Sequence, residues 1–316
     1  MLAGKSSING GKMEISSNTN RCASQLTAVV TSFNQGEMIQ EALKSLLNQT
    51  ILPDKIIIVD DGSTDEKSLD IIRGLESMVN QVPIMVHRQK NSGVSAARNT
   101  GIQLANTTFA LVLDGDDKLE PSFVEQALPH IKKSSEIVAV SSWMKTFGVL
   151  QSIVCPSGGD IRKFLSHNCC PATHIMRCEA WRKCGGYDET MRTGFEDWDY
   201  FLRLLETSPK ARIAIVEEAL IDYRTVPASS NVRSMDKRLE LMKYLMEKHS
   251  NAYAKHMVDV MLDLEAISIS RLYAWESEMK KQILNSNLSD ASKKFMKSPS
   301  YGDGGMAAAV RIAARI

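Results

Sequence analysis

The sequence lacks an excess of charge of either sign and any long hydrophobic run. Its 316 residues include 38 basic and 37 acidic side chains, a formal net charge of +1. This balance argues against a protein that binds nucleic acid through bulk electrostatics. No uninterrupted apolar run reaches the roughly 18 residues that a membrane-spanning helix needs. Residues 1–24 are rich in Ser, Asn and Gly and lack the hydrophobic segment of a secretory signal, so we expect a disordered leader and a cytoplasmic protein.

Cysteine is scarce as well. The six cysteines are Cys22, Cys155, Cys169, Cys170, Cys178 and Cys184. Four of them lie near His167 and His174, which raises the question of zinc. There is no Cys-x-x-Cys pair, however, and two adjacent cysteines do not readily converge on one metal. We therefore expect free thiols, and no disulfide framework in a reducing compartment.

What the sequence does contain is an alternation of strand-length and helix-length segments. Hydrophobic residues make up 43% of the chain, enough to bury a sizeable core. β-branched runs predict strands, and apolar residues at helical spacing predict helices between them. Strands and helices alternate over residues 26–33, 37–48, 55–59, 68–79, 82–87, 93–105, 109–113, 121–133 and 137–143. This pattern of βαβ crossovers predicts an α/β fold with a mostly parallel central sheet flanked by helices.

The second half of the chain is less regular. Residues 145–175 read as irregular, apolar spacing from residue 196 predicts an amphipathic helix, and residues 213–216 and 219–223 read as two short strands. From residue 233 long helical segments follow. We therefore divide the chain into a leader (1–24), an α/β domain (25–232) and a C-terminal helical extension (233–316). The extension would pack on the domain or form a homodimer, and peripheral contact with the inner face of a membrane stays open as an alternative.

Polar clusters follow three of the predicted strands. They are residues 31–34, 60–63 and 114–117. In parallel sheets, ligands bind where the strands end at their carboxyl edge. Neither a G-x-G-x-x-G loop nor a G-x-x-x-x-G-K-[ST] loop is present to cradle phosphates. We therefore expect an anionic ligand that is held through a metal and side chains.

The acids after residues 109–113 are central to this expectation. Asp114, Asp116 and Asp117 surround Gly115 directly after an apolar strand. Mg²⁺ or Mn²⁺ would neutralise such a cluster, because these hard cations prefer carboxylate oxygens. A solvated Asp-Gly turn is the alternative. In the same way, the acids at residues 196 and 197 could serve only as a helix cap.

Taken in order, six short motifs resemble the family 2 glycosyltransferases with the GT-A fold. They are VVTSFN (29–34), IVDDGSTD (58–65), GVSAARNTG (93–101), LDGDD (113–117), GGYD (185–188) and EDW (196–198). The resemblance implies a Rossmann-like, GT-A-type sheet over residues 25–230. It also implies an inverting, metal-dependent transferase of polysaccharide biosynthesis. Such an enzyme would move a sugar from a nucleotide-diphospho-sugar, with a UDP-sugar expected first, to a hydroxyl of a glycan or glycoconjugate acceptor.

The resemblance also assigns roles to single residues of the donor site. Thr31, Phe33 and Asn34 would line the nucleotide pocket, with the Phe33 ring stacked on the base. Asp61 would accept a hydrogen bond from the base edge, which suits the N3–H of uracil. Arg98 would approach the donor sugar or its phosphates, where a planar and permanently charged group is useful.

Asp114 and Asp116 match the family's D-x-D pair. Asp116 would bind the Mn²⁺ or Mg²⁺ directly, and Asp114 would share the metal site and reach the ribose or donor sugar. Asp197 matches the general base, which takes the proton from the acceptor hydroxyl in a single inverting displacement. Family members often carry a histidine shortly after the last strand. Here Val226 follows residues 223–225, so we expect the cation to be held more loosely.

The acceptor is expected to bind within residues 145–196. The candidate contacts are Glu196, His174 and Trp198, and a place in the buried core is the alternative for such aromatic side chains. Two other functions are weighed against transfer. One is a sugar-1-phosphate nucleotidyltransferase, which would need a glycine-rich basic loop that residues 31–36 do not provide. The other is a degenerate, non-catalytic binding module.

Overall fold

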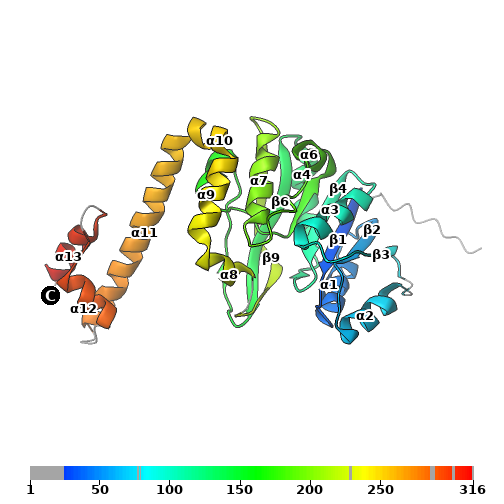
Figure 1. Cartoon of the computed structure of the whole chain (residues 1–316), viewed down its shortest axis with the longest axis horizontal. Helices are drawn as coiled ribbons and strands as arrows, with labels where there is room; N and C mark the ends of the chain where they lie inside the picture. The colour runs from blue at the N-terminus through cyan, green and yellow to red at the C-terminus, as the bar shows by residue number, and fades with distance from the viewer. Residues whose placement is uncertain are drawn as a thin grey trace, which may run out of the picture.

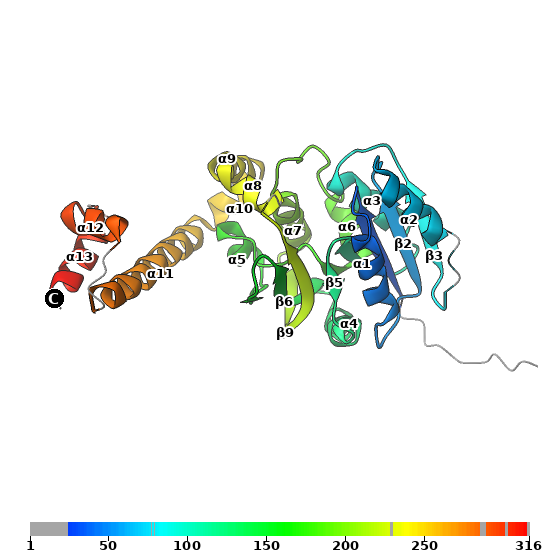
Figure 2. The same ribbon diagram turned by 90° about the horizontal axis from the view of Figure 1, so that it is seen from below.

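The computed structural model describes residues 25–76, 78, 80–227, 230–284, 289–300 and 303–314. The expected leader at residues 1–24, with Cys22, lies outside them. An α/β body is followed by an arm of helices that reaches away from it, as two perpendicular views show (Figures 1 and 2). The expected α/β fold with a helical C-terminal part is confirmed.

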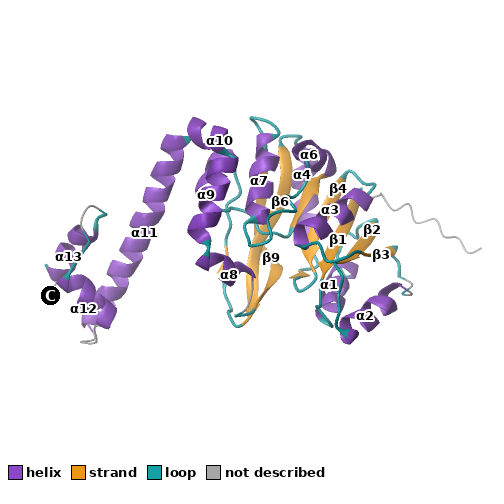
Figure 3. Ribbon diagram, viewed as in Figure 1, coloured by secondary structure: helices purple, strands orange, loops and turns teal. Residues whose placement is uncertain are grey.

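Among the residues that the structure describes, one mixed sheet of nine strands forms the centre of the body (Figure 3). In spatial order its strands are β3 (Ile84–Arg88), β2 (Lys55–Asp60), β1 (Leu26–Ser32), β4 (Phe109–Asp114), β8 (His174–Arg177), β6 (Ile137–Gly148), β9 (Arg212–Thr225) and β5 (Lys118–Leu119), and β7 (Ile153–Val154) pairs with β6. The first four strands are parallel, as the crossovers predict. Strand β8 then runs antiparallel to both β4 and β6.

Helices cover both faces of this sheet, which is why its central strands β2 and β4 are apolar over most of their length. One face carries α1 (Met38–Leu47), α2 (Glu66–Glu76) and α4 (Phe123–Lys133), and the other carries α3 (Val94–Leu104), α5 (Ile161–Ser166), α6 (Cys178–Cys184) and α7 (Glu196–Glu206). Along β1, Ala28 and Val30 contribute to the first core and Val29 to the second. This alternation follows from the period of two in a strand.

Two predictions for the second half are wrong. Residues 145–175, expected to be irregular, contain β7, α5 and the start of β8. The two short strands expected near residue 220 are a single strand, β9. Ser142 and Trp143 of β6 pair with Val216 and Ala219 of β9. Glu217 and Glu218 therefore have no partner in β6 and form a bulge in β9. These two acids interrupt the apolar run in the sequence, but they do not end the pairing.

The C-terminal helices begin on the body and then leave it. Helices α8 (Ser230–Asp236), α9 (Arg238–Lys248) and α10 (Ser250–Lys255) precede the long α11 (Met257–Leu284), which is followed by α12 (Asp290–Lys297) and α13 (Gly305–Ala313). His249 Nε2 and Lys248 Nζ lie 3.0 and 2.7 Å from the buried Asp199 carboxylate of α7. The expected division at residues 232 and 233 falls within α8, and it stays a prediction. No helix in the described ranges is long and apolar enough to cross a membrane.

We expect two glycines in helices to respond in opposite ways to alanine. A Cβ at Gly101 of α3 would lie 2.2 Å from Val29 Cγ1 and 3.1 Å from Val59 Cγ2, whereas one at Gly74 of α2 meets nothing within 4 Å. Gly74→Ala should therefore stabilise the fold by about 0.5–1 kcal/mol. Gly101→Ala should destabilise it by about 1–2 kcal/mol, because overpacking outweighs helix propensity. Urea unfolding measures both, and a shift in the same direction would contradict the close packing of α3 on the sheet.

Candidate active site

A cleft of about 660 Å³ opens at the carboxyl edge of the parallel strands, a volume typical of small-molecule sites. Its walls come from the end of β4, the starts of α3, α7 and α9, strand β9 and the loop after β7. Five of the residues predicted for the site line it: Arg98, Asp114, Glu196, Asp197 and Trp198. The fold therefore brings together three motifs that are far apart in the chain.

Arg98 connects these motifs. Its side chain is 2% exposed, and its Nη2 donates to both carboxylate oxygens of Asp114 at 2.8 Å. Its Nη1 lies 3.5 Å from Glu196 Oε1. Burial acts to lower the pKa of Arg98, but the charge of Asp114, assisted by Tyr187 and Glu196, outweighs it and raises the pKa. The guanidinium therefore stays charged while it joins β4 to α7.

The other two acids after β4 differ in their contacts. Asp116 accepts one long hydrogen bond, 3.5 Å from Gln35 Nε2. Asp117 is buried and accepts the backbone N–H of Arg224 at 2.8 Å. Burial raises the pKa of both carboxyls, and neighbouring acids, Asp114 for Asp116 and chiefly Asp116 for Asp117, raise it further. Both carboxyls therefore keep their protons to a higher pH than a free aspartate does, and a bound cation would oppose this shift.

Gly115 lets the chain turn between these acids beside the first strand. A Cβ at this position would lie 2.7 Å from the carbonyl oxygen of Thr31 and 2.1 Å from Gln35 Oε1. The Thr31 hydroxyl in turn donates to Asp114 Oδ1 at 3.1 Å. Only glycine fits this close approach, so the acids are held by the end of β1.

Of the acids after β4, Asp116 is the one best able to bind a divalent cation. Across the ranges that the structure describes, no three His, Cys, Asp or Glu side chains are grouped to hold a metal by themselves. The Asp114 carboxylate is engaged by Arg98, whereas Asp116 has a single long contact. A carboxylate ligand with phosphate and water oxygens would suit Mg²⁺ or Mn²⁺. The five cysteines that the structure describes are free thiols. Cys22 lies outside the described residues.

Asp197 lies at the start of α7 with its carboxylate held from two sides. Its Oδ2 accepts from Asn168 Nδ2 at 3.0 Å, and its Oδ1 accepts from the backbone N–H of Trp198 at 2.8 Å. Burial and the charge of Glu196 raise the pKa of Asp197, and the charge of Arg98 opposes them. A base whose pKa lies close to the working pH is suited to proton transfer. Sequence reasoning did not identify Asn168, which lies in a loop with no recognisable motif.

Two residues predicted for the nucleotide pocket organise loops at the same edge of the sheet. Asn34 Oδ1 accepts the backbone N–H of Thr64 at 2.7 Å. The buried Asp61 carboxylate accepts three hydrogen bonds of 2.8 Å, from Gln89 Nε2 and from the N–H groups of Ser92 and Gly93. A carboxylate has about four acceptor positions, so these three bonds leave one of them unfilled. Neither residue lines the cleft itself.

The remaining predicted residues differ in exposure. The Phe33 ring is 45% exposed next to this edge, so it can meet a base, and Thr31 is buried against Asp114. His174 is completely buried under α7, with its ring centroid 5.0 Å from that of Phe201. Burial lowers the pKa of His174 to about 4. The structure therefore places His174 in the core, and the expected acceptor contact is corrected for this residue, because no face of its ring reaches the cleft.

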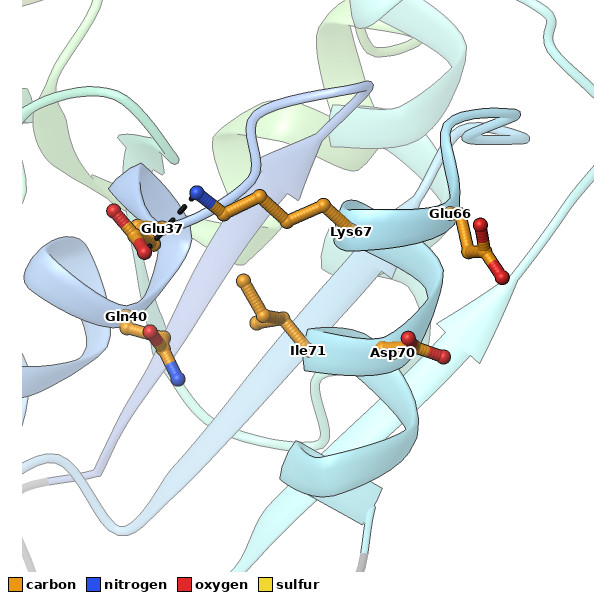
Figure 4. A pocket seen from close by; sticks show the side chains of 6 residues that line it. All are labelled: Glu37, Gln40, Glu66, Lys67, Asp70 and Ile71. Carbon is orange, nitrogen blue, oxygen red and sulfur yellow. Dashed lines mark ion pairs between the residues drawn. The ribbon is translucent and has the colours of Figure 1, made fainter.

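A second hollow lies between α1 and α2 (Figure 4). In it Lys67 Nζ reaches Glu37 Oε1 at 3.1 Å, and both side chains are more than half exposed. Exposed ion pairs of this kind contribute little to stability. The hollow offers no buried charge or nucleophile, so we place the active site at the cleft.

Comparison with known proteins agrees with this geometry. Residues 27–183 match the model of the family described as glycosyl transferase family 2. Chondroitin synthase of Escherichia coli is 28% identical over 204 residues, which are 63% of this chain and only 29% of that protein. An uncharacterized glycosyltransferase of Methanocaldococcus jannaschii is 25% identical over 240 residues, 73% of this chain and 81% of that protein.

A solved structure shares the fold. S. aureus TarS in complex with UDP-GlcNAc aligns with a TM-score of 0.54 at 19% identity, over 65% of this chain and 60% of that chain. The chain thus spans less than two thirds of TarS and less than one third of chondroitin synthase.

We expect the Arg98 contacts to be a major stabilising feature. Arg98→Met leaves the carboxylates of Asp114 and Glu196 without their shared cation and should destabilise the fold by about 3–5 kcal/mol. Arg73→Met removes an exposed pair with Asp70 and should change stability by less than about 0.5 kcal/mol. Urea unfolding compares the two variants. Equal stability of Arg98→Met and the wild type would show that the buried charge is not needed to hold the cleft together.

Proposed function

The chain belongs to glycosyltransferase family 2, and from this we propose that it transfers a sugar from a nucleotide-diphospho-sugar to a hydroxyl of a glycan or glycoconjugate acceptor. The observation that carries the proposal is that Asp114, Arg98 and Asp197 line one cleft at the carboxyl edge of the sheet. A UDP-sugar is the first candidate donor, because TarS was solved with UDP-GlcNAc. Relatives named chondroitin synthase and hyaluronan synthase support a role in polysaccharide synthesis.

The donor would lie along the ends of β1, β2 and β4. Phe33 would stack on the base, and the remaining acceptor position of Asp61 would receive the N3–H of uracil. Asp114, which Thr31 and Arg98 hold in place, would meet the ribose or the donor sugar. Since Arg98 already binds Asp114 and Glu196, we propose that it acts mainly by fixing these acids beside the donor.

A divalent cation fits at Asp116, with the donor phosphates as its other ligands. When bound, Mn²⁺ or Mg²⁺ would neutralise the negative charge that develops on the leaving diphosphate. Asp114 would have to bind the cation while its carboxylate remains paired with Arg98.

We assign the general base to Asp197. As the acceptor oxygen attacks the anomeric carbon, Asp197 takes the hydroxyl proton. The bond from the anomeric carbon to the phosphate oxygen breaks at the same centre, and the nucleoside diphosphate leaves with the bonding electrons. A single displacement of this kind inverts the anomeric configuration, and the transition state carries oxocarbenium character. Asn168 orients the base by donating to its second oxygen.

The two alternative functions explain fewer observations. A nucleotidyltransferase needs a cradle of backbone N–H groups or basic side chains after β1, and the loop there carries Phe33 and Asn34. A non-catalytic module would have no use for an acid held at a raised pKa in the cleft. Slow hydrolysis of the donor by the wild-type protein would exclude a purely binding role.

The role of the C-terminal arm stays a proposal. One side of α11 exposes Val258, Leu262, Ile269 and Tyr273 at helical spacing. Such a stripe suits a homodimer or a peripheral membrane contact. Sedimentation of the protein, alone and with lipid vesicles, distinguishes the two.

Asp197→Asn should lower the rate of transfer by about 10²–10⁴-fold, the usual contribution of a general base. Binding of UDP should stay unchanged, because the substitution keeps the size of the side chain. In the wild type, kcat should fall as the pH drops below about 7, the value to which burial and Glu196 raise the pKa of Asp197. Glu37→Gln, at the exposed hollow between α1 and α2, is the matched control and should leave the rate unchanged. A folded Asp197→Asn enzyme with the wild-type rate would exclude Asp197 as the base.

Calorimetry with UDP tests the metal site. The wild type should bind UDP more tightly with Mn²⁺ than without it, and Asp116→Asn should lose this difference while its metal-free affinity is unchanged. Asp70→Asn, on the exposed face of α2, should behave like the wild type. If no nucleoside diphosphate binds in a metal-dependent way, the assignment of a cation to Asp116 is wrong.

A further inference from the structure

The cleft has a second wall, formed by residues that are not part of the donor site. Helices α8 and α9 lie beside α7, as Figures 1 and 2 both show. Arg238, the first residue of α9, lines the cleft together with Ser234 and His167. None of these residues belongs to a motif of the sequence analysis. This wall therefore adds the guanidinium of Arg238 to the cleft.

Arg238 is a cation without an acidic partner. Its guanidinium carbon lies 5.4 Å from the ring centroid of Phe195 and 6.0 Å from that of Trp198. Within the described part of the chain, Arg238 forms no ion pair and no hydrogen bond through its side chain. Arg98, by contrast, is engaged by Asp114 and Glu196. Stacking on rings leaves the N–H edge of a guanidinium available, and this edge binds carboxylates or phosphates in a bidentate way.

The aromatic platform under Arg238 is held rigidly. Phe195 has a φ of +64°, which is rare for a bulky residue. A Cβ on its neighbour Gly194, whose φ is +119°, would lie 2.6 Å from Ser234 Cβ, so this turn is pressed against α8. The indole N–H of Trp198 donates to the carbonyl of Phe164 at 2.6 Å. Backbone strain of this kind persists where the surrounding structure determines it, often at binding sites.

His167 adds a second polar group to this wall. The Ser166 hydroxyl donates to the carbonyl of Lys163 at 3.1 Å, and His167 Nδ1 lies 2.9 Å from the same hydroxyl oxygen. This contact holds the His167 ring at the edge of the cleft.

We infer that this wall is an acceptor subsite for an anionic group, so that the acceptor is a glycan or polyol that bears a carboxylate or a phosphate. The inference rests on the proposed function. Its support is position: Trp198, under Arg238, directly follows the base Asp197, and Asn168, next to His167, donates to that base. The group that Arg238 binds is therefore on the molecule whose hydroxyl meets Asp197. The donor diphosphate belongs beside Asp116.

The inference is tested by binding of three probes, measured with and without UDP and Mn²⁺. They are a tetrasaccharide ending in glucuronic acid, its carboxyl-reduced counterpart ending in glucose, and a short glycerol phosphate oligomer. The wild type should bind at least one anionic probe about tenfold more tightly than the neutral one, as expected for a charge-assisted hydrogen bond. Which anionic probe binds distinguishes a carboxylate from a phosphate.

Substitutions then locate the effect. Arg238→Met should remove the preference for the anionic probe, and Arg238→Lys should keep part of it. Lys237→Met removes an exposed neighbouring charge that does not line the cleft and should keep all of it. The affinity for UDP should be the same in all four proteins.

Two results would overturn the inference. One is equal binding of the acidic and neutral probes by the wild type. The other is an Arg238→Met variant that keeps its preference, or that loses affinity for UDP, which would assign Arg238 to a structural role or to the donor diphosphate. If the wild type binds no nucleoside diphosphate, the proposed function fails, and the comparison of probes without UDP still decides whether this wall binds anions.

Discussion

A single buried guanidinium determines much of this structure. Arg98 comes from α3, one of its acidic partners ends β4, and the other begins α7. A charge removed from water is tolerated only when partners of opposite charge are held close to it. The position of Arg98 and the positions of the two acids therefore depend on each other. The result is that segments separated by about a hundred residues, from Arg98 to Glu196, meet at one edge of the sheet.

Burial also raises the pKa of acids close to Arg98. Asp114, Asp116 and Asp117 lie close together, and burial together with their mutual repulsion raises the pKa of the latter two. Arg98 is bound to Asp114 and leaves the Asp116 carboxylate with one long hydrogen bond, from Gln35, which is why we propose the cation at Asp116. Asp197 is held further along the same cleft by Asn168, at a pKa raised by burial. Under our proposal, Asp116 would hold the cation and Asp197 would take the proton.

The two arginines in the cleft differ in what they can do. Arg98 has its charge balanced within the protein by Asp114 and Glu196, and we propose that it positions these two acids. Arg238 rests on aromatic rings and has no acid beside it among the residues that the structure describes, so its charge is available to a ligand. We therefore propose that Asp114 marks the donor side of the cleft and Arg238 the acceptor side.

The sequence by itself determined the alternation of strands and helices, and with it the parallel half of the sheet and the polar strand ends, because β-branched runs and helical periodicity are local signals. It also proposed Asp114, Asp116 and Asp197 as site residues, because they lie in short motifs, and these roles stay predictions. Only the tertiary structure decided that Arg98 binds acids, that His174 is core, that residues 174–177 insert a strand between β4 and β6, and that Asn168 and Arg238 line the cleft. Each of these depends on contacts between residues distant in the chain, and the geometry of such contacts leaves no periodic or local trace in the sequence.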